Sequence, residues 1–205
     1  MGRTSDARER LIEATIDLIR TRSYAAVTVD ALCEAADVRK GSFYHFFASK
    51  DELVLAALQS HWETRRPVLD RLFSPLTPPL DRLRNYFADI YQRQAQLKKR
   101  YGHFVGCLFS SVGTGAGETN PEILAKVQEI LSSYERYYQS ALTEAAARGE
   151  VRARDIEGKA RSLFAFMEGV LSQARIHDDE EMIRKLGENA FRFLGVEPAR
   201  KTRRG

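Results

Sequence analysis

The most informative part of the sequence is VTVDALCEAADVRKGSFYHFFASK (residues 27–50). Its apolar residues recur at helical spacing over two short segments, 29–36 and 40–46. Between them lies a turn centred on Asp37, of the length that sets two helices at the steep angle of a helix-turn-helix. Thr28 precedes the first segment and is a good N-cap residue. The stretch therefore predicts two short helices packed at a steep angle.

Apolar side chains of this segment are expected to fix the two helices in place. The residues that close the inside of the angle are Leu32, Ala35 and Val38. Those that hold the second helix against the preceding part of the chain are Phe43, Phe46 and Phe47. Asp30 lies in the first turn of the first helix, where a negative charge complements the helix dipole. Cys33 is expected to be inert packing.

The other face of the second helix is polar and basic. It carries Arg39, Lys40, Ser42, Tyr44 and His45. Lys50 follows, and no acidic residue lies between Val38 and Lys50. Gly41 has no side chain, so the backbone there can approach a partner closely. A helix with this face fits the major groove of DNA.

This segment resembles the DNA-binding domain of the tetracycline-repressor (TetR) family of bacterial regulators, from about Ala7 to Leu58. The residues that carry the resemblance are Thr28, Leu32, Ala36, Val38, Gly41, Phe43, Tyr44, His45, Phe46 and Lys50. Two positions depart from the family pattern. Asp37 stands where the family usually has the turn glycine, although aspartate tolerates the left-handed conformation. Arg39 stands where the family often has Ser or Thr, so a helix cap is lost and a long cation is gained.

The resemblance implies roles for individual residues. The residues expected to contact phosphates are Thr28, Tyr44, His45 and Lys50. Those expected to contact base edges are Arg39, Lys40 and Ser42, because Arg and Lys pair well with guanine. Gly41 is expected at the same interface. The resemblance also implies a homodimer, which doubles the number of bases that one short helix reads.

Helical spacing continues along the rest of the chain, so the sequence predicts an all-α protein: an N-terminal three-helix helix-turn-helix domain and a C-terminal helical bundle for ligand binding and dimerisation. Asp6 and Glu9 form a capping box for a first helix over about 7–22, and Ser49 with Glu52 forms another. Pro67, with Pro75, Pro78 and Pro79, is expected to interrupt the pattern. Further helices are expected over about 80–100, 121–149, 155–177 and 179–194, with an irregular or weakly helical segment over 102–117. The expected domains are 1–50, 51–198 and a disordered basic tail, 199–205.

Composition adds mainly exclusions. Lys+Arg 32 minus Asp+Glu 28 gives a net charge of +4, and the last six residues alone supply four positive charges. The two cysteines fit neither a disulfide framework nor a structural zinc site, which favours a reducing, cytoplasmic setting. No run of apolar residues resembles a signal peptide or a membrane span.

No motif points to an enzyme. The segment 113–117 is rich in glycine, but it lacks the G-x-G-x-x-G spacing and the Lys-Ser/Thr of a P-loop. The four histidines form no H-E-x-x-H or similar ligand pair, and G-x-S-x-G is absent. We therefore expect no catalytic residues, no metal and no cofactor.

An effector site is expected in the aromatic-rich second half, because helical bundles place ligand pockets between helices. Candidate lining residues are Tyr91, His103, Cys107, Tyr134 and Phe166. The Gly-Cys-Leu sequence at 106–108 also resembles a TetR subgroup that includes the repressor of N-ethylmaleimide reductase, in which this cysteine senses electrophiles or oxidants. Basic neighbours at 98–100 and His103 are expected to favour a thiolate. The alternative is that Cys107 is simply a small packed residue.

The last two helices have wide apolar faces, which the resemblance assigns to a dimer interface. Those residues are Ala160, Leu163, Phe164, Met167, Val170, Leu171, Ala174, Met182, Leu186, Ala190, Phe191 and Leu194. The predicted function is a homodimeric transcriptional regulator, usually a repressor in this family, that leaves an inverted-repeat operator when a small molecule or thiol modification changes its conformation. Two alternatives stay open: a constitutive architectural DNA-binding protein, and a small-molecule-binding helical bundle.

Overall fold

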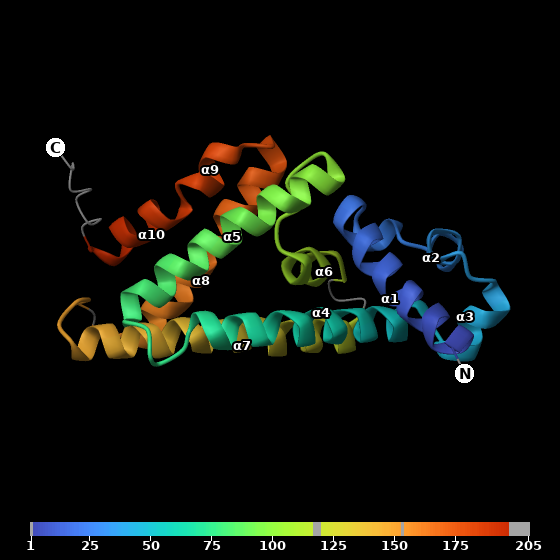
Figure 1. Cartoon of the computed structure of the whole chain (residues 1–205), viewed down its shortest axis with the longest axis horizontal. Helices are drawn as coiled ribbons and strands as arrows, with labels where there is room; N and C mark the ends of the chain where they lie inside the picture. The colour runs from blue at the N-terminus through green and yellow to red at the C-terminus, as the bar shows by residue number, and fades with distance from the viewer. Residues whose placement is uncertain (1, 117–119, 153, 197–205) are drawn as a thin grey trace. The chain divides into compact units, whose positions relative to one another are not determined.

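The computed structural model describes residues 2–116, 120–152 and 154–196. Within these ranges every regular element is a helix, which confirms the all-α fold class. In chain order (Figure 1) the elements are α1 (Gly2–Thr21), η1 (Tyr24–Ala26), α2 (Val29–Ala36), α3 (Lys40–Phe46), α4 (Lys50–Leu72), α5 (Pro79–Tyr101), α6 (Leu108–Ala116), α7 (Pro121–Ala147), α8 (Ile156–His177), α9 (Glu180–Arg184) and α10 (Leu186–Leu194). The predicted basic tail lies outside the described residues.

The caps of several helices confirm the predicted boundaries. The Thr28 hydroxyl accepts a hydrogen bond from the Ala31 N–H at 3.2 Å and begins α2. Ser49 accepts from the Glu52 N–H at 3.1 Å and begins α4. Asp155 accepts from the Gly158 N–H at 2.8 Å and begins α8. Each cap satisfies an N–H that the first helical turn leaves without a partner.

The start of α1 differs from the prediction. The helix begins at Gly2, so Asp6 is not its N-cap. Asp6 lies inside the helix, where its carboxylate is 3.8 Å from the Arg10 guanidinium. The extra turn carries no apolar residues at helical spacing, so the sequence pattern could not reveal it.

Pro67 does not interrupt the chain, because α4 continues through it to Leu72. A proline inside a helix removes one backbone hydrogen bond and costs about 3 kcal/mol. Burial of Leu69 and Phe73 just beyond it favours the continued helix. The break between helices occurs instead at the segment that contains Pro75 and Pro78.

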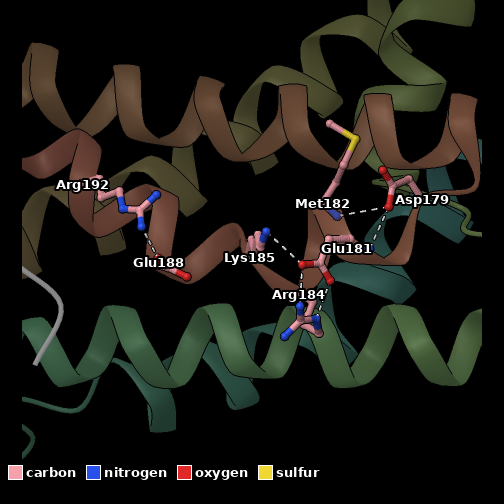
Figure 2. Close-up of polar contacts among 7 residues, drawn as sticks. All are labelled: Asp179, Glu181, Met182, Arg184, Lys185, Glu188 and Arg192. Carbon is pink, nitrogen blue, oxygen red and sulfur yellow. Dashed lines mark hydrogen bonds and ion pairs between the residues drawn. The ribbon is translucent and has the colours of Figure 1, made fainter. Parts of the chain in front are cut away.

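The helix predicted over 179–194 is divided at Lys185 into α9 and α10. Lys185 has φ −87° and ψ −2°, outside ideal helical values. Two residues later, Gly187 packs its backbone against Phe87, and a Cβ there would lie 3.4 Å from the Phe87 Cβ. Figure 2 shows the polar contacts along this segment: Asp179 caps α9, Glu181 pairs with Arg184 and Lys185, and Glu188 pairs with Arg192.

The glycine-rich segment over 102–117, expected to be irregular or weakly helical, contains the short helix α6. Two glycines of this helix serve packing. A Cβ at Gly113 would lie 3.0 Å from the Val127 side chain, and one at Gly115 would lie 3.0 Å from the Tyr24 side chain. Both spacings are tighter than ordinary van der Waals contact, so the absent side chains let α6 approach α7 and η1 closely.

Contacts divide the chain into two compact units, which do not coincide with the predicted domains. Unit 1 comprises Met1–Val68 and Cys107–Ser132, and unit 2 comprises Leu69–Gly106 and Ser133–Gly205. In unit 1, α1 packs on α2, α3 and α6. In unit 2, α10 packs on α5 and α8. No described helix is both long and apolar enough to cross a membrane.

Unit 2 has an aromatic core with one buried cation. Tyr86 and Tyr138 meet edge-on with ring centroids 5.5 Å apart. Arg82 is buried, and its guanidinium donates to the carbonyl oxygens of Thr77 and Pro75. It also pairs with Glu144, so it fixes the segment before α5 against α7. Burial opposes ionisation of Glu144, but hydrogen bonds from Arg82 and Arg148 outweigh it and lower the pKa of that carboxyl.

Candidate functional site

The inner side of α3 is anchored and its outer side is exposed. Phe43 and Phe47 are buried, and their rings lie 6.2 Å apart. On the outer side the exposed residues are Arg39, Lys40, Gly41, Ser42, Tyr44 and His45. Tyr44 is 53% exposed, which is unusual for a large aromatic side chain that has no binding role. The expected polar face therefore lies on one accessible surface.

The packing of α2 differs from the prediction at one position. Ala35 is exposed, whereas Cys33 and Ala36 are buried together with Leu32. The buried face of α2 is therefore rotated slightly relative to the one expected from the sequence. Cys33 is buried as expected, and burial, with a smaller contribution from Asp30, raises the pKa of its thiol.

Thr28 and Lys50, the residues that flank the two helices, have structural roles. The Thr28 side chain is exposed and caps α2 through its oxygen, which leaves the hydroxyl proton available to another acceptor. The Lys50 ammonium lies 4.4 Å from the centre of the Tyr24 ring. The Tyr24 hydroxyl donates to Asp51 at 2.9 Å. Burial and this carboxylate raise the pKa of Tyr24 to about 12.

Lys40 has a partner that the sequence pattern did not indicate. Its Nζ lies 2.7 Å from Oδ1 of Asp30 on α2. The Asp30 carboxylate raises the pKa of Lys40 through this hydrogen bond and its charge. The sequence pattern predicts only a dipole interaction for Asp30. Its position ten residues before Lys40, across the turn, was the only sign of this contact in the sequence.

The turn between α2 and α3 confirms the expected backbone and reveals its support. Asp37 adopts the left-handed conformation, with φ 50° and ψ 52°. From α1, the Arg10 guanidinium donates to the Asp37 carbonyl at 3.2 Å and lies 3.6 Å from its carboxylate. Arg39 stands at the N-cap of α3 and makes no side-chain cap. The carboxylate that replaces the usual glycine is thus held by a cation from another helix.

The candidate effector residues in unit 2 lie in separate places. Tyr91 donates to Glu180 at 2.8 Å, and this carboxylate raises the pKa of the phenol. His103 precedes Phe104, whose N–H donates to Asp178 at 3.1 Å, and the same carboxylate pairs with Lys98 at 2.9 Å. Tyr134 is buried and packs on Phe164. Phe166 stacks on Phe193 with ring centroids 5.7 Å apart and an interplanar angle of 9°.

Unit 2 contains a groove of about 440 Å³ between α5, α9 and α10. Tyr91 lines it, and none of the other four candidates does. Its remaining lining residues are Arg84, Phe87, Ala88, Ile183, Arg184, Gly187, Glu188 and Phe191. The Arg84 guanidinium lies 4.7 Å from the centre of the Phe191 ring. The groove thus combines aromatic surface with cations.

Cys107, the fifth candidate, immediately precedes α6 in unit 1. It is partly exposed, and its carbonyl accepts from the Ser111 N–H at 3.1 Å, as expected of the residue that begins a helix. A negative charge at a helix N-terminus is favoured by the dipole. Lys98, which we expected to act on this thiol, pairs with Asp178 instead.

Most of the residues assigned to a dimer interface, on α8, α9 and α10, are buried in the protomer's own core. Leu186 is fully buried, as are most members of the predicted interface. The apolar side chains left at least partly exposed include Phe166, Val170, Ile176, Met182 and Phe193. Phe166 and Val170 lie one turn apart on the same side of α8, and Ile176 lies about 80° around the helix from Phe166. The sequence pattern could not separate this outer stripe from the wider inner face.

An anchored helix with an exposed basic face, set by a tight turn on a second helix, defines a helix-turn-helix DNA-binding protein. Residues 11–57 match the bacterial regulatory proteins of the tetR family, and residues 79–188 match the tetracyclin repressor-like C-terminal domain. The chain belongs to the TetR family of transcriptional regulators. Members of this family bind DNA operators, dimerise and are not enzymes.

Similar proteins support this assignment. The chain is 30% identical to the transcriptional regulator AcuR of Cereibacter sphaeroides over 173 residues, which cover 83% of this chain and 77% of that protein. A crystal structure of regulatory protein TetR from Rhodobacter sphaeroides is 27% identical, with a TM-score of 0.80, and the match covers 92% of this chain and 98% of that one.

The resemblance to the Gly-Cys-Leu subgroup is supported only over part of the chain. The transcriptional repressor NemR of Escherichia coli is 30% identical over 103 residues, which cover 50% of each chain. Membership of the family is therefore shown, whereas membership of that subgroup stays a prediction.

Proposed function

We propose that the protein represses transcription by binding an inverted-repeat operator as a homodimer, with α3 of each protomer in the major groove. The observation that carries this proposal is the exposed face of α3, which is basic and contains no carboxylate over residues 39–50. DNA carries one negative charge about every 1.7 Å along its axis, so such a face is attracted to it.

Within this face, we assign different tasks to different residues. Arg39, Lys40 and Ser42 contact base edges, because long cations and a hydroxyl reach donors and acceptors in the groove. The residues assigned to phosphates are Thr28, Tyr44, His45 and Lys50. A Cβ at Gly41 would meet no heavy atom within 4 Å, so this part of the helix is open to an approaching duplex.

The second copy is proposed to dock on the outer stripe of α8 and α10, defined by Phe166, Val170, Ile176 and Phe193. Phe193 is 44% exposed and Ile176 67% exposed in the single chain. Large apolar side chains at the centre of an interface gain most from being removed from water. Twofold symmetry then presents two α3 helices to two half-sites.

Two substitutions test the division of tasks on DNA. Lys40→Ala is expected to weaken operator binding by about tenfold or more while changing binding to random DNA much less, because a base contact is lost. Lys50→Ala is expected to weaken both to a similar extent and to reduce the salt slope by about one. Fluorescence anisotropy over a salt series, with an operator selected from a random library, measures both. Equal losses on the two DNAs for Lys40→Ala contradict a base-reading role.

We further propose that an effector releases the operator, either by occupying the groove lined by Tyr91 or by modifying Cys107. The aromatic and cationic lining of the groove supports the first route, since such sites hold small planar or acidic molecules. Partial exposure at the start of α6 supports the second, because a thiolate is the reactive form and a helix N-terminus favours it.

Labelling the native protein with N-ethylmaleimide separates the two routes. If thiol modification is the signal, Cys107 is alkylated first and operator binding falls, while Cys107→Ser binds DNA and no longer responds. Cys33→Ser is the matched control, because Cys33 is buried and its removal leaves the response intact. An unlabelled Cys107, or a Ser variant that still releases DNA, excludes the thiol route and leaves the groove.

A further inference from the structure

The ion pair between Asp30 and Lys40 joins the two helices of the helix-turn-helix on its outer surface. The Lys40 Nζ lies 2.7 Å from Asp30 Oδ1, within the range of a charge-assisted hydrogen bond. The two side chains are 55% and 76% exposed. The carboxylate therefore lies beside the face that meets DNA, although the sequence of α3 itself contains no acid.

Stability does not account for this pair. Exposed ion pairs contribute little to folding stability, since water and salt screen them and two flexible side chains must be ordered. The α2–α3 angle is held by buried Phe43, by Leu32 and by the Arg10 contact to the turn. An acid beside a DNA-binding surface also repels phosphates. The pair thus has a cost for DNA binding that its stabilising effect does not explain.

The geometry suggests a benefit in recognition. An ammonium group has three donors, and the contact with Asp30 uses one, which leaves two for a base edge. A free lysine side chain loses considerable rotamer entropy when it is ordered on binding. Because Asp30 already orders the Lys40 ammonium group, less rotamer entropy is lost when the remaining donors bind acceptors on a base edge.

On DNA without the matching base, the same pair works against binding. The positive charge of Lys40 is then balanced by Asp30 and is only weakly attracted to phosphates, while the Asp30 carboxylate still repels them. We propose that Asp30 is a specificity-determining residue, which positions Lys40 for one base edge and lowers affinity for all other DNA. This inference rests on the proposed base-reading role of Lys40.

The test compares operator and random duplex of equal length by fluorescence anisotropy. Asp30→Asn removes the charge and keeps the shape. We expect its affinity for random DNA to rise about three- to tenfold, with operator affinity changed less than about twofold, so that discrimination falls. Asp30→Ser provides a second neutral variant. Thermal midpoints close to that of the wild-type protein verify that both are folded.

Glu34→Gln is the matched control. Glu34 is an exposed acid on the same helix, so the net charge changes equally. This variant is expected to shift both affinities by the same factor and leave discrimination unchanged. In the Lys40→Ala background, Asp30→Asn is expected to have no effect on discrimination, because its action passes through Lys40.

The outcomes distinguish this inference from the proposed function. If Lys40→Ala weakens operator binding selectively but Asp30→Asn leaves discrimination unchanged or raises it, Asp30 has no such role while base reading by Lys40 stands. If Glu34→Gln lowers discrimination as much as Asp30→Asn, general charge is the cause and the inference is overturned. If Lys40→Ala affects both DNAs equally, base reading itself is wrong.

Discussion

The exposed face of α3 and the outer stripe of α8 and α10 are both available to partners, but their chemistry is opposite. The α3 face presents cations and hydroxyl groups above a buried anchor, Phe43. The outer stripe presents apolar side chains, with Phe166 and Phe193 stacked in parallel. Each helix keeps one side for its own unit and offers the other to a partner.

This difference implies two kinds of binding energy. Contacts with phosphates depend on released counterions and weaken as salt increases. Burial of apolar surface is largely independent of salt at moderate concentration, and strongly hydrated anions strengthen it. A regulator built this way can leave DNA without losing its dimeric state. The following predictions use this contrast, beginning with the largest effect.

A charge in the outer stripe is expected to break the dimer. Phe193→Asp places two carboxylates, one per protomer, in a desolvated surface, so the dimer dissociation constant should rise by about three orders of magnitude. Light scattering measures the mass, and circular dichroism checks the helical content. A dimer of unchanged mass from a folded Phe193→Asp variant places the interface elsewhere.

Leu186→Glu provides the contrast within the same helix. Leu186 is fully buried in the protomer, so a charge there unfolds or destabilises the chain rather than separating two folded copies. Glu188→Ala, at an exposed position of α10, is expected to change neither property. The contrast between Phe193→Asp, which separates folded protomers, and Leu186→Glu, which destabilises each protomer, distinguishes the outer stripe from the inner face.

In the wild-type protein, added salt is expected to weaken DNA binding by the α3 face but not dimerisation through the outer stripe. If a dimer neutralises about four phosphates with lysine and arginine, doubling the salt weakens operator binding by about tenfold. The mass in light scattering should stay that of the dimer over the same range. Dissociation of the dimer in parallel with loss of DNA would contradict an apolar interface.

The helix-turn-helix was largely predictable, because its boundaries depend on local signals. Each of these signals involves residues only a few positions apart. They are the cap at Thr28, the turn at Asp37, and the spacing of Phe43 and Phe47. The contacts of Arg10 with Asp37 and of Asp30 with Lys40 were missed, since they join residues 27 and 10 positions apart on exposed surfaces. No hydrophobic periodicity reports such pairs.

The second half was less predictable for a related reason. Apolar spacing identified α5, α7 and α8, but it could not show which apolar residues face the protomer and which face outward. Leu186 and Phe193 are equally apolar in the sequence, and only the packing of α10 on α5 and α8 distinguishes them. The groove likewise combines α5 with residues about 90 positions later, a separation that the sequence pattern cannot bridge.

A substitution in the turn that supports α3 is expected to have a smaller effect, which is on the melting temperature. Asp37→Gly removes a residue with a side chain from the left-handed region and restores the residue usual in the family. It also removes the carboxylate near Arg10. Since exposed ion pairs contribute little, the backbone gain should prevail and raise the melting temperature by about 1–4 °C. Arg10→Ala in the wild-type protein should lower it. A lower melting temperature for Asp37→Gly would show that the Arg10 contact dominates.

The smallest effect concerns Tyr24, which ties η1 to α4 in the unit that carries α3. Its pKa of about 12, against an ordinary value near 10, means that the unfolded chain releases this proton first. The stabilisation is therefore complete below about pH 10 and is lost as the pH rises toward 12. Tyr24→Phe keeps the ring under Lys50 but has no proton to lose, so its stability should fall less than that of the wild type over this range.

Denaturant unfolding at pH 8, 10 and 11 measures this difference, and groups common to both proteins, such as the lysines, cancel in the comparison. Tyr44→Phe is the matched control, because it removes one phenol hydroxyl from the exposed face of α3, where the side chain is 53% exposed. If Tyr24→Phe and the wild type lose stability in parallel, the hydrogen bond to Asp51 does not hold the proton. The tie between η1 and α4 would then depend on apolar packing, as the outer stripe of α8 and α10 does.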